Sequence, residues 1–311
     1  MLLNALIWLG RQGRYCLIAG LLVGLIAPDL AQILKPWVGT LVALLLFVTA
    51  IRIGAARAIG RLDEGLATLG RIALLQVALP LIMLLVLHGL NILDHPLALA
   101  VVLMLAAPSL TGAPNFAIML GHDPAPGIRL LVLSTALFPL TALPVLYVVD
   151  PAGTGALGAI GLSLNLLAAI LCAVGLGFGV RRLLPQLGKA RAQAALDGCA
   201  ALLLAIVVVG LMSAIGPLVR SDVAALLGWM AAAMIINIGL VASTLSVARR
   251  VPFKIPLATA IYAGNRNIAL FLIVLPEAAA APLMIFIGCY QVPMYLTPIL
   301  LSRFQHRTAG T

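Results

Sequence analysis

The apolar run from 257 to 275 is interrupted in its middle by residues that could do chemistry. They are Tyr262, Gly264, Asn265, Arg266 and Asn267. A bilayer core about 30 Å thick needs roughly 20 apolar residues, so the run is long enough to cross it. A guanidinium near mid-membrane costs about 2.5 to 3.5 kcal/mol, so Arg266 is expected only where a partner, water or a ligand offsets that cost. Because backbone opened at this depth must line protein or a polar cavity, we predict a broken helix that carries a binding site.

A second apolar run, from 103 to 120, is interrupted in a similar way. Pro108, Gly112 and Pro114 surround the polar Ser109, Thr111 and Asn115. Proline removes a backbone donor and clashes with the preceding turn, so two of them within seven residues should open the helix. We predict that the two broken helices cross, with their amino ends attracting anions and their carbonyl ends attracting cations.

Further polar residues lie at similar depth in two other apolar runs. They are Gln76, Ser134 and Thr135. Each alone could be an ordinary interhelical hydrogen bond, but together with the breaks they outline one polar cavity. The predicted substrate-binding residues are Pro108, Thr111, Asn115, Asn265, Arg266 and Asn267. No catalytic residue and no metal site is predicted, because the four cysteines show no CxxC spacing and the histidines lie near span ends or in the tail.

The composition defines the fold class as an all-α polytopic membrane protein. Hydrophobic residues make up 63% of the 311 residues and charged residues only 9%, against about 25% charged in soluble domains. The long apolar runs favour helices over a membrane β-barrel, whose strands alternate over about 10 residues. Every loop is short, so residues 1–311 are expected to form a single transmembrane unit.

Ten apolar spans can be marked along the chain. They cover residues 16–32, 37–51, 72–91, 97–120, 129–149, 157–180, 197–217, 223–247, 255–275 and 281–302. This count places 16 of the 19 basic residues on one side, leaving Lys35 and Arg220 on the other and Arg266 inside a span. Basic residues mark cytoplasmic loops, so both termini are predicted to be cytoplasmic. Because the basic residues sit in short loops, the net charge of +10 does not indicate a nucleic-acid partner.

Ten spans divide into two sets of five, at about 16–150 and 157–302. Five is odd, so the second set would run opposite to the first, which is the inverted-repeat arrangement of many secondary transporters. The interrupted runs then fall in corresponding positions, as the fourth and ninth spans. Residues 1–10 are expected to form a short interfacial helix before the first span.

Several short motifs resemble the bile acid:sodium symporter family. They are Gly-Ala-Pro-Asn at 112–115, Gly-His-Asp at 121–123 and Ala-Gly-Asn-Arg-Asn-Ile-Ala-Leu at 263–270. The resemblance implies interleaved panel and core subdomains, the core being built around the crossing of spans four and nine. It also implies sodium ions behind the crossing and an organic anion in front of it.

Residue by residue, the resemblance implies that Asn115 is the crossing asparagine, with Pro114 standing where a small hydroxyl residue is usual. The ion ligands it implies are Gln76, Asn115, Ser134, Thr135 and Tyr262. The family pattern Glu-x-Gly-x-Gln-Asn is changed here, because Tyr262 takes the place of the glutamate and Arg266 takes the place of the glutamine. A fixed positive charge would repel sodium. Arg266 is therefore expected to stand in for the coupling ion, or to hold an anionic substrate group directly.

The predicted function is secondary transport of a small organic anion by alternating access. No cofactor is predicted apart from the sodium ion that the resemblance implies, and Arg266 and Tyr262, which replace the expected ligands, argue against sodium coupling. Alternatives are a proton-coupled or efflux carrier of the arsenite or auxin type, an intramembrane lipid-modifying enzyme, and a channel. Arsenite carriers use a cysteine in span four, and none lies between Cys16 and Cys172. Enzyme motifs such as HExxH and GxSxG are absent from the sequence. The expected setting is a bacterial inner membrane, with the lipid bilayer as partner and the protein a monomer or homodimer.

Overall fold

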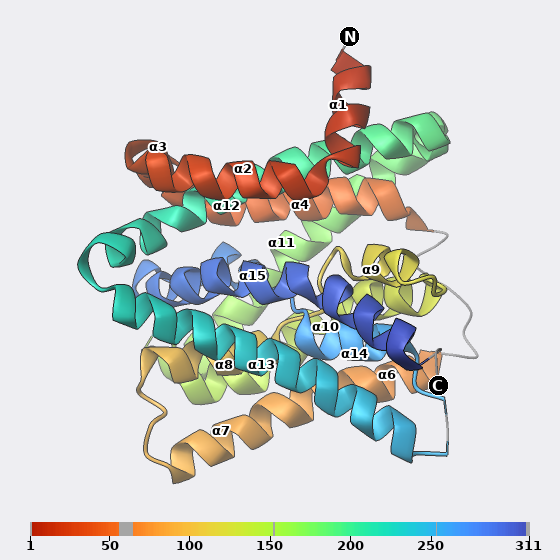
Figure 1. The fold of residues 1–311 in the computed structure, drawn as a ribbon. Coiled ribbons are helices and arrows are strands. Elements are labelled where there is room, and N and C mark those ends of the chain that lie inside the picture. Colours follow the sequence, from red (N-terminus) through yellow and green to blue (C-terminus); the bar gives the residue numbers. More distant parts are fainter. Residues whose placement is uncertain (1, 56–64, 152, 253, 309–311) are drawn as a thin grey trace. The chain divides into compact units, whose positions relative to one another are not determined.

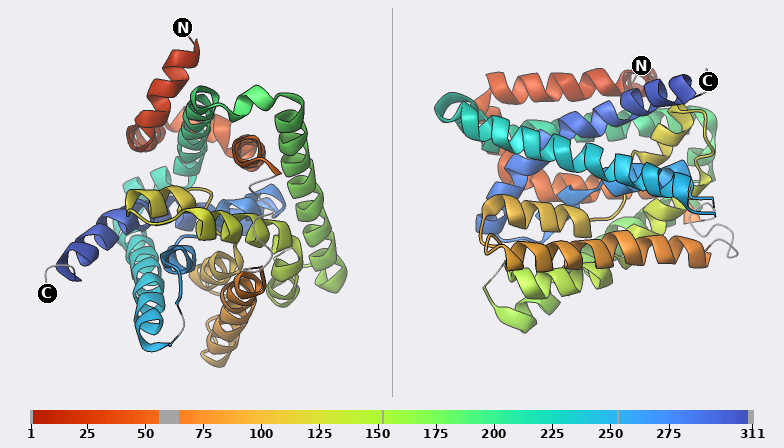
Figure 2. Two further views of the ribbon diagram at one scale, coloured as in Figure 1. Left: turned by 90° about the vertical axis from the view of Figure 1, so that its right-hand side faces the viewer. Right: turned by 60° about the horizontal axis from the view of Figure 1, so that its bottom comes forward.

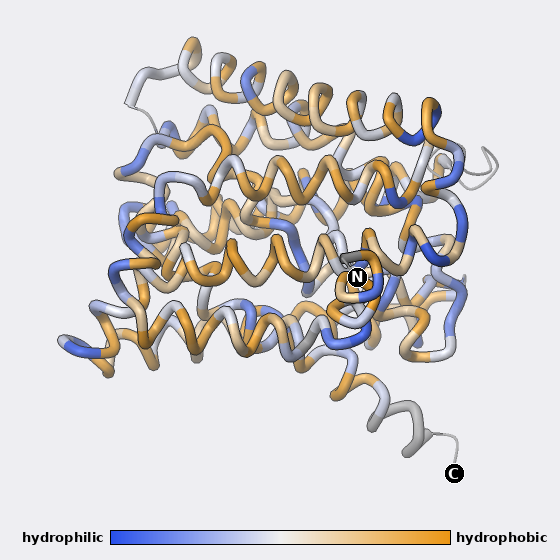
Figure 3. Tube along the Cα trace, turned by 90° about the horizontal axis from the view of Figure 1, so that it is seen from above, coloured by the Kyte–Doolittle hydropathy of each residue, from blue (hydrophilic) through white to orange (hydrophobic). Residues whose placement is uncertain are grey.

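The computed structural model describes residues 2–55, 65–151, 153–252 and 254–308. Every regular element in these ranges is a helix (Figure 1 and Figure 2). Seven helices in the described part are long and apolar enough to cross a membrane. Hydrophobic residues run along the helices, and hydrophilic residues are concentrated where helices end (Figure 3). The chain is therefore an all-helical, multi-pass membrane protein.

Three of the predicted spans are not single long helices. The fourth and ninth are interrupted, and the first is divided at Ala27 into α2 (Gly13–Ile26) and α3 (Pro28–Leu34). Ala27 cannot continue α2 because the ring of Pro28 excludes the helical conformation from the residue before it. The loop predicted between spans one and two is helical instead, since α3 leads through η1 (Lys35–Trp37) directly into α4 (Val38–Ile53). Arg57 and Arg61, used in the count of basic residues, lie outside the described residues.

Contacts between residues divide the chain into two units. The first consists of Met1–Ala58, Val149–Val223 and Ala269–Gly288, and the second of Ile59–Val148, Ala224–Ile268 and Cys289–Thr311. Each unit thus draws helices from both halves of the sequence.

The first unit is built around one long helix, α12 (Ala190–Ser221), which packs against α1 to α4. Its other elements are α1 (Leu2–Arg11), α11 (Gly155–Leu183), η4 (Pro185–Gly188), η5 (Ile268–Ile273) and the start of α15 (Glu277–Thr308). Gly20 and Gly24 of α2 face α12 closely: a Cβ on Gly20 would lie 2.6 Å from the Ala205 carbonyl oxygen, and one on Gly24 2.6 Å from the Met212 Cβ. These glycines let the two helices approach, as small residues do in membrane bundles.

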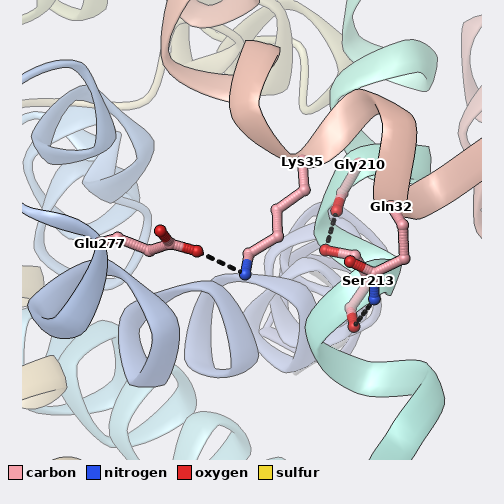
Figure 4. A network of polar contacts seen from close by, with 5 residues as sticks. All are labelled: Gln32, Lys35, Gly210, Ser213 and Glu277. Atoms are coloured by element: carbon pink, nitrogen blue, oxygen red, sulfur yellow. Dashed lines mark hydrogen bonds and ion pairs between the residues drawn. The ribbon is translucent and has the colours of Figure 1, made fainter.

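Polar contacts join separate segments of the first unit (Figure 4). Lys35 Nζ lies 2.9 Å from Glu277 Oε1, which links η1 to the first turn of α15. Gln32 Nε2 donates to the Ser213 carbonyl at 3.4 Å, and the Ser213 hydroxyl donates to the Gly210 carbonyl at 2.7 Å. The ion pair is largely exposed, so it contributes little to stability.

The second unit is organised around a short helix, α14 (Leu257–Gly264), which is buried from Ala258 onward. Its other elements are α6 (Gly65–Ile72), the π-helical segment η3 (Ala73–Ala78), α7 (Leu79–Gly89), α8 (Pro96–Ala106), α9 (Ala113–Met119), α10 (Ala125–Val149), α13 (Val223–Arg250) and the rest of α15. One face of α14 packs with Phe116 of α9, and another with Ile72 of α6 and Leu130 of α10.

Candidate functional site

The two interrupted segments meet through their backbones, at a point that we call the crossing (residues 107–112 and 265–267). The Leu110 N–H donates to the Asn265 carbonyl at 3.0 Å, and the Asn267 N–H donates to the Pro108 carbonyl at 2.8 Å. Ser109 and Arg266 thereby form an antiparallel β-bridge. The crossing lies within the second unit, and it gives hydrogen-bond partners to backbone that the broken helices leave open.

Local sequence explains why both helices stop here. Ala107 is extended, with φ −68° and ψ 151°, because it precedes Pro108 and is excluded from the helical region. In the other segment, Asn265 is extended at the end of α14, with φ −125° and ψ 98°. Gly264 before it is required by a close approach, since a Cβ there would lie 2.7 Å from the Asn237 carbonyl oxygen.

The Arg266 guanidinium is buried at the crossing, with the residue only 1% exposed. Its three nitrogens each donate to a backbone carbonyl: Nε to Ala263 at 3.2 Å, Nη1 to Ala107 at 3.1 Å and Nη2 to Leu75 at 3.0 Å. The guanidinium also lies over the Tyr262 ring, 4.2 Å from its centroid, a cation–π contact that favours the charged form.

Each of these carbonyls lacks its usual helical donor. The Ala263 carbonyl would accept from residue 267, but the Asn267 N–H donates to Pro108. In η3 the Leu79 N–H donates to Leu74, and the next residue, Pro80, has no N–H to give to Leu75. Ala107 stands where α8 has already ended. The planar fork of one arginine therefore satisfies three carbonyls that the helix breaks leave without partners.

The position of Arg266 also matches the electrostatics of the helix ends. α8 ends at Ala106 and α14 at Gly264, and the guanidinium bonds to carbonyls at both ends. A helix C-terminus carries about half a negative charge, so two together offset roughly one positive charge. Arg266 thus fills the place where two helix ends would attract a cation.

Tyr262 connects Arg266 to the predicted ion ligands. Its hydroxyl donates to Gln76 Oε1 at 2.6 Å. The Gln76 amide in turn donates to the Ser134 carbonyl at 3.1 Å and to the Thr141 hydroxyl at 2.7 Å. These contacts join η3, α10 and α14, and they bring Gln76, Tyr262 and the backbone carbonyl of Ser134 into one network.

The two hydroxyl residues of α10 differ in their contacts. Ser134 Oγ accepts a hydrogen bond from the Ser109 N–H at 3.0 Å, so it ties α10 to the crossing. Thr135 is also buried, and its Oγ1 has no hydrogen-bond partner among the described residues. Only Ser134 is therefore linked directly to the crossing.

The predicted substrate-binding residues separate into buried and partly exposed members. Pro108, Asn265 and Arg266 are buried, whereas Thr111, Asn115 and Asn267 are partly exposed. Asn267 Nδ2 donates to the Thr111 hydroxyl at 3.2 Å, which joins the two interrupted segments through their side chains. The partly exposed members are the ones that a ligand could reach without moving backbone.

Thr141 and three further residues of the site were not singled out from the sequence. Tyr290 of α15 and Asn237 of α13 both donate to the Gly264 carbonyl. The Thr297 hydroxyl lies 3.1 Å from Asn237 Oδ1 and 3.2 Å from Asn265 Oδ1. The available signal was the presence of isolated polar residues in apolar sequence, which by itself does not separate a site residue from an ordinary interhelical contact.

No protein-family model matches this chain, and no curated protein matches it either. Inference about its function therefore depends on the geometry of the crossing.

Proposed function

We propose that this chain is a secondary transporter that moves a small organic anion across the membrane by alternating access. The interrupted α8–α9 and α14–η5 segments support the arrangement of ten spans in two inverted repeats, because they occupy corresponding places in the two halves. The composition of the two units supports it too, since the first takes α2 to α4 from one half and α11 and α12 from the other. In this proposal the first unit is the panel subdomain and the second is the core.

One observation carries the mechanism: the Arg266 guanidinium bonds to carbonyls at the ends of both interrupted helices. In the family that the sequence resembles, this region behind the crossing is where sodium would bind. The residues here do not fit that ion, since a guanidinium occupies the carbonyl ends and Tyr262 replaces the acid. We therefore propose that Arg266 is a permanent, covalently attached substitute for the coupling cation.

The substrate is proposed to bind on the partly exposed side of the crossing, at Thr111, Asn115 and Asn267. These residues offer hydroxyl and amide groups that can donate to an anion. Arg266 would act on the anion through its charge rather than by contact, because its donors are engaged with backbone carbonyls and it is 1% exposed. No residue is assigned a catalytic role.

The test is transport by the purified protein in liposomes. Uptake of a panel of radiolabelled organic anions is measured by counterflow, with sodium or choline as the external cation. We expect accelerated exchange of at least one anion, at the same rate in both salts. Strict dependence on sodium would refute the role of Arg266, and the absence of counterflow for every anion would favour a channel or an enzyme.

A second arm restores the residues that the family pattern would have. The double variant Tyr262→Glu and Arg266→Gln replaces the fixed cation by oxygen ligands, which sodium prefers. We expect the melting temperature of this variant in detergent to rise with sodium concentration. The melting temperature of the wild type should change equally in sodium and in potassium. A sodium-specific rise in wild type would contradict the proposal, because a ligand stabilises the state that binds it.

A further inference from the structure

A groove on the second unit runs along α13 and is closed on its other side by α15. It has a volume of about 210 Å³ and is lined from Asn237 to Arg249 on α13 and from Thr297 to Leu301 on α15. The α13 residues lining it recur every three to four positions, so they form one stripe on the helix. With a rise of about 1.5 Å per residue, the stripe from Asn237 to Arg249 is roughly 18 Å long.

The chemistry of the groove changes along its length. Its middle is aliphatic, with Val241 and Leu245 on α13 opposite Leu301 on α15. One end carries Arg249, which lies exposed in the last turn of α13. The described residues provide no acidic partner for Arg249, in contrast to Arg52, which pairs with Asp197 at 2.6 Å.

In a membrane, the exposed side of α13 would face the hydrocarbon of the bilayer, and the groove along this helix would open there. α13 is long and apolar enough to span a membrane, and only 11% of its most apolar stretch is buried in the protein. Arg249 is in the last turn of this helix, so in a membrane it would lie where lipid headgroups meet water. An aliphatic groove that ends at a guanidinium without an acidic partner among the described residues matches the shape and charge of an anionic lipid.

We propose that this groove binds one anionic phospholipid, with its phosphate on Arg249 and part of one acyl chain between α13 and α15. Guanidinium and phosphate form paired, charge-assisted hydrogen bonds, which a zwitterionic lipid with a compensating ammonium group satisfies less well. This proposal does not depend on the transport function, since its test measures the binding of a lipid and not the movement of a substrate.

Two residues at the inner end of the groove connect the lipid site to the crossing. Asn237 and Thr297 line that end, and both also bond to the α14 end, Asn237 to the Gly264 carbonyl and Thr297 to Asn265 Oδ1. A chain packed between α13 and α15 holds these two helices at the spacing that this network requires. The bound lipid is therefore expected to stabilise the crossing.

Native mass spectrometry of the purified full-length protein tests the proposal. Phosphatidylglycerol and phosphatidylcholine with identical acyl chains are added in equal amounts, and the bound adducts are counted. Wild type should retain phosphatidylglycerol preferentially. Arg249→Gln should lower that preference about tenfold, the ratio that one charge-assisted hydrogen bond supports. The matched control is Arg250→Gln, which removes the neighbouring exposed charge and should leave the preference unchanged.

A third variant tests the acyl chain. Ala242 lines the groove and is exposed, so Ala242→Phe should fill the channel and abolish the phosphatidylglycerol adduct while Arg249 remains. Melting curves without added lipid establish that each variant is folded. Equal retention of both lipids by wild type, equal losses in the two arginine variants, or full retention in Ala242→Phe would each overturn the proposal.

Discussion

At the scale of single residues, the Arg266 guanidinium donates three hydrogen bonds to backbone carbonyls at once. Three donors in one plane reach the carbonyls of Ala263 in α14, Leu75 in η3 and Ala107 just after α8. Hydrogen bonds from charged groups contribute about 1.5 to 3 kcal/mol each, and a buried carbonyl left alone costs about 1 to 3 kcal/mol. The arginine therefore stabilises the interruption of the helices as well as supplying charge.

The variant Arg266→Lys tests this directly. An ammonium keeps the charge but lacks the planar fork, so it should leave at least one carbonyl without a donor and destabilise the protein by about 2 kcal/mol or more. Thermal unfolding in detergent, followed by tryptophan fluorescence, measures the change. Arg250→Lys, at the exposed end of α13, is the control and should melt like wild type. Equal melting temperatures for both variants would show that the fork is not needed.

At the scale of elements, proline and glycine decide where helices stop and where they touch. Pro108 ends α8 by excluding the helical conformation from Ala107. Pro80 has no N–H, so the Leu75 carbonyl of η3 accepts a hydrogen bond from Arg266 instead. Gly20 and Gly24 have a different effect, since they bring α2 against α12 without interrupting either helix. Proline thus determines where these helices end, and glycine determines how closely they pack.

The packing role of glycine gives a prediction with a matched control. Gly20→Ala places a methyl group 2.6 Å from the Ala205 carbonyl oxygen, so α2 and α12 must separate, at a cost of about 1 to 3 kcal/mol. Gly175→Ala, in the middle of α11, meets no atom within 4 Å and should be neutral or slightly stabilising. Melting temperatures in detergent distinguish the two. A larger loss for Gly175→Ala would contradict the packing account.

At the scale of the whole molecule, the proposed ten spans require both termini on the same side, and the basic residues predict that this side is the cytoplasm. Alkaline phosphatase, which is active only outside the cytoplasm, can be fused after successive spans. A fusion after Gly153, between α10 and α11, should be active, and one after Gly188, between α11 and α12, should be inactive, as should one at the C-terminus. Activity at Gly188 or at the C-terminus would refute the proposed topology.

The cost of placing polar or helix-breaking residues in hydrocarbon explains why part of the site could be predicted from the sequence. The apolar runs are long because each helix must cross hydrocarbon, so the helical fold follows from composition. Pro108, Gly264 and the central Arg266 are costly in such a setting, and costly residues point to a function. The structure agrees on both interruptions, since α8 ends at Ala106 and α14 at Gly264. The first two spans were less predictable, because Pro28 begins a new helix where the sequence pattern indicated one continuous span.

The sequence by itself determined that the chain is a helical membrane protein with two broken helices and an arginine in one of them, because apolar length and missing backbone donors are local properties. Only the tertiary structure decided what Arg266 binds and which residues support the crossing. Leu75, Ala107, Asn237 and Thr297 are distant from residue 266 along the chain or carry no distinguishing pattern. Their roles arise from which carbonyls the folded helices leave without a donor, and that depends on how segments far apart in sequence pack together.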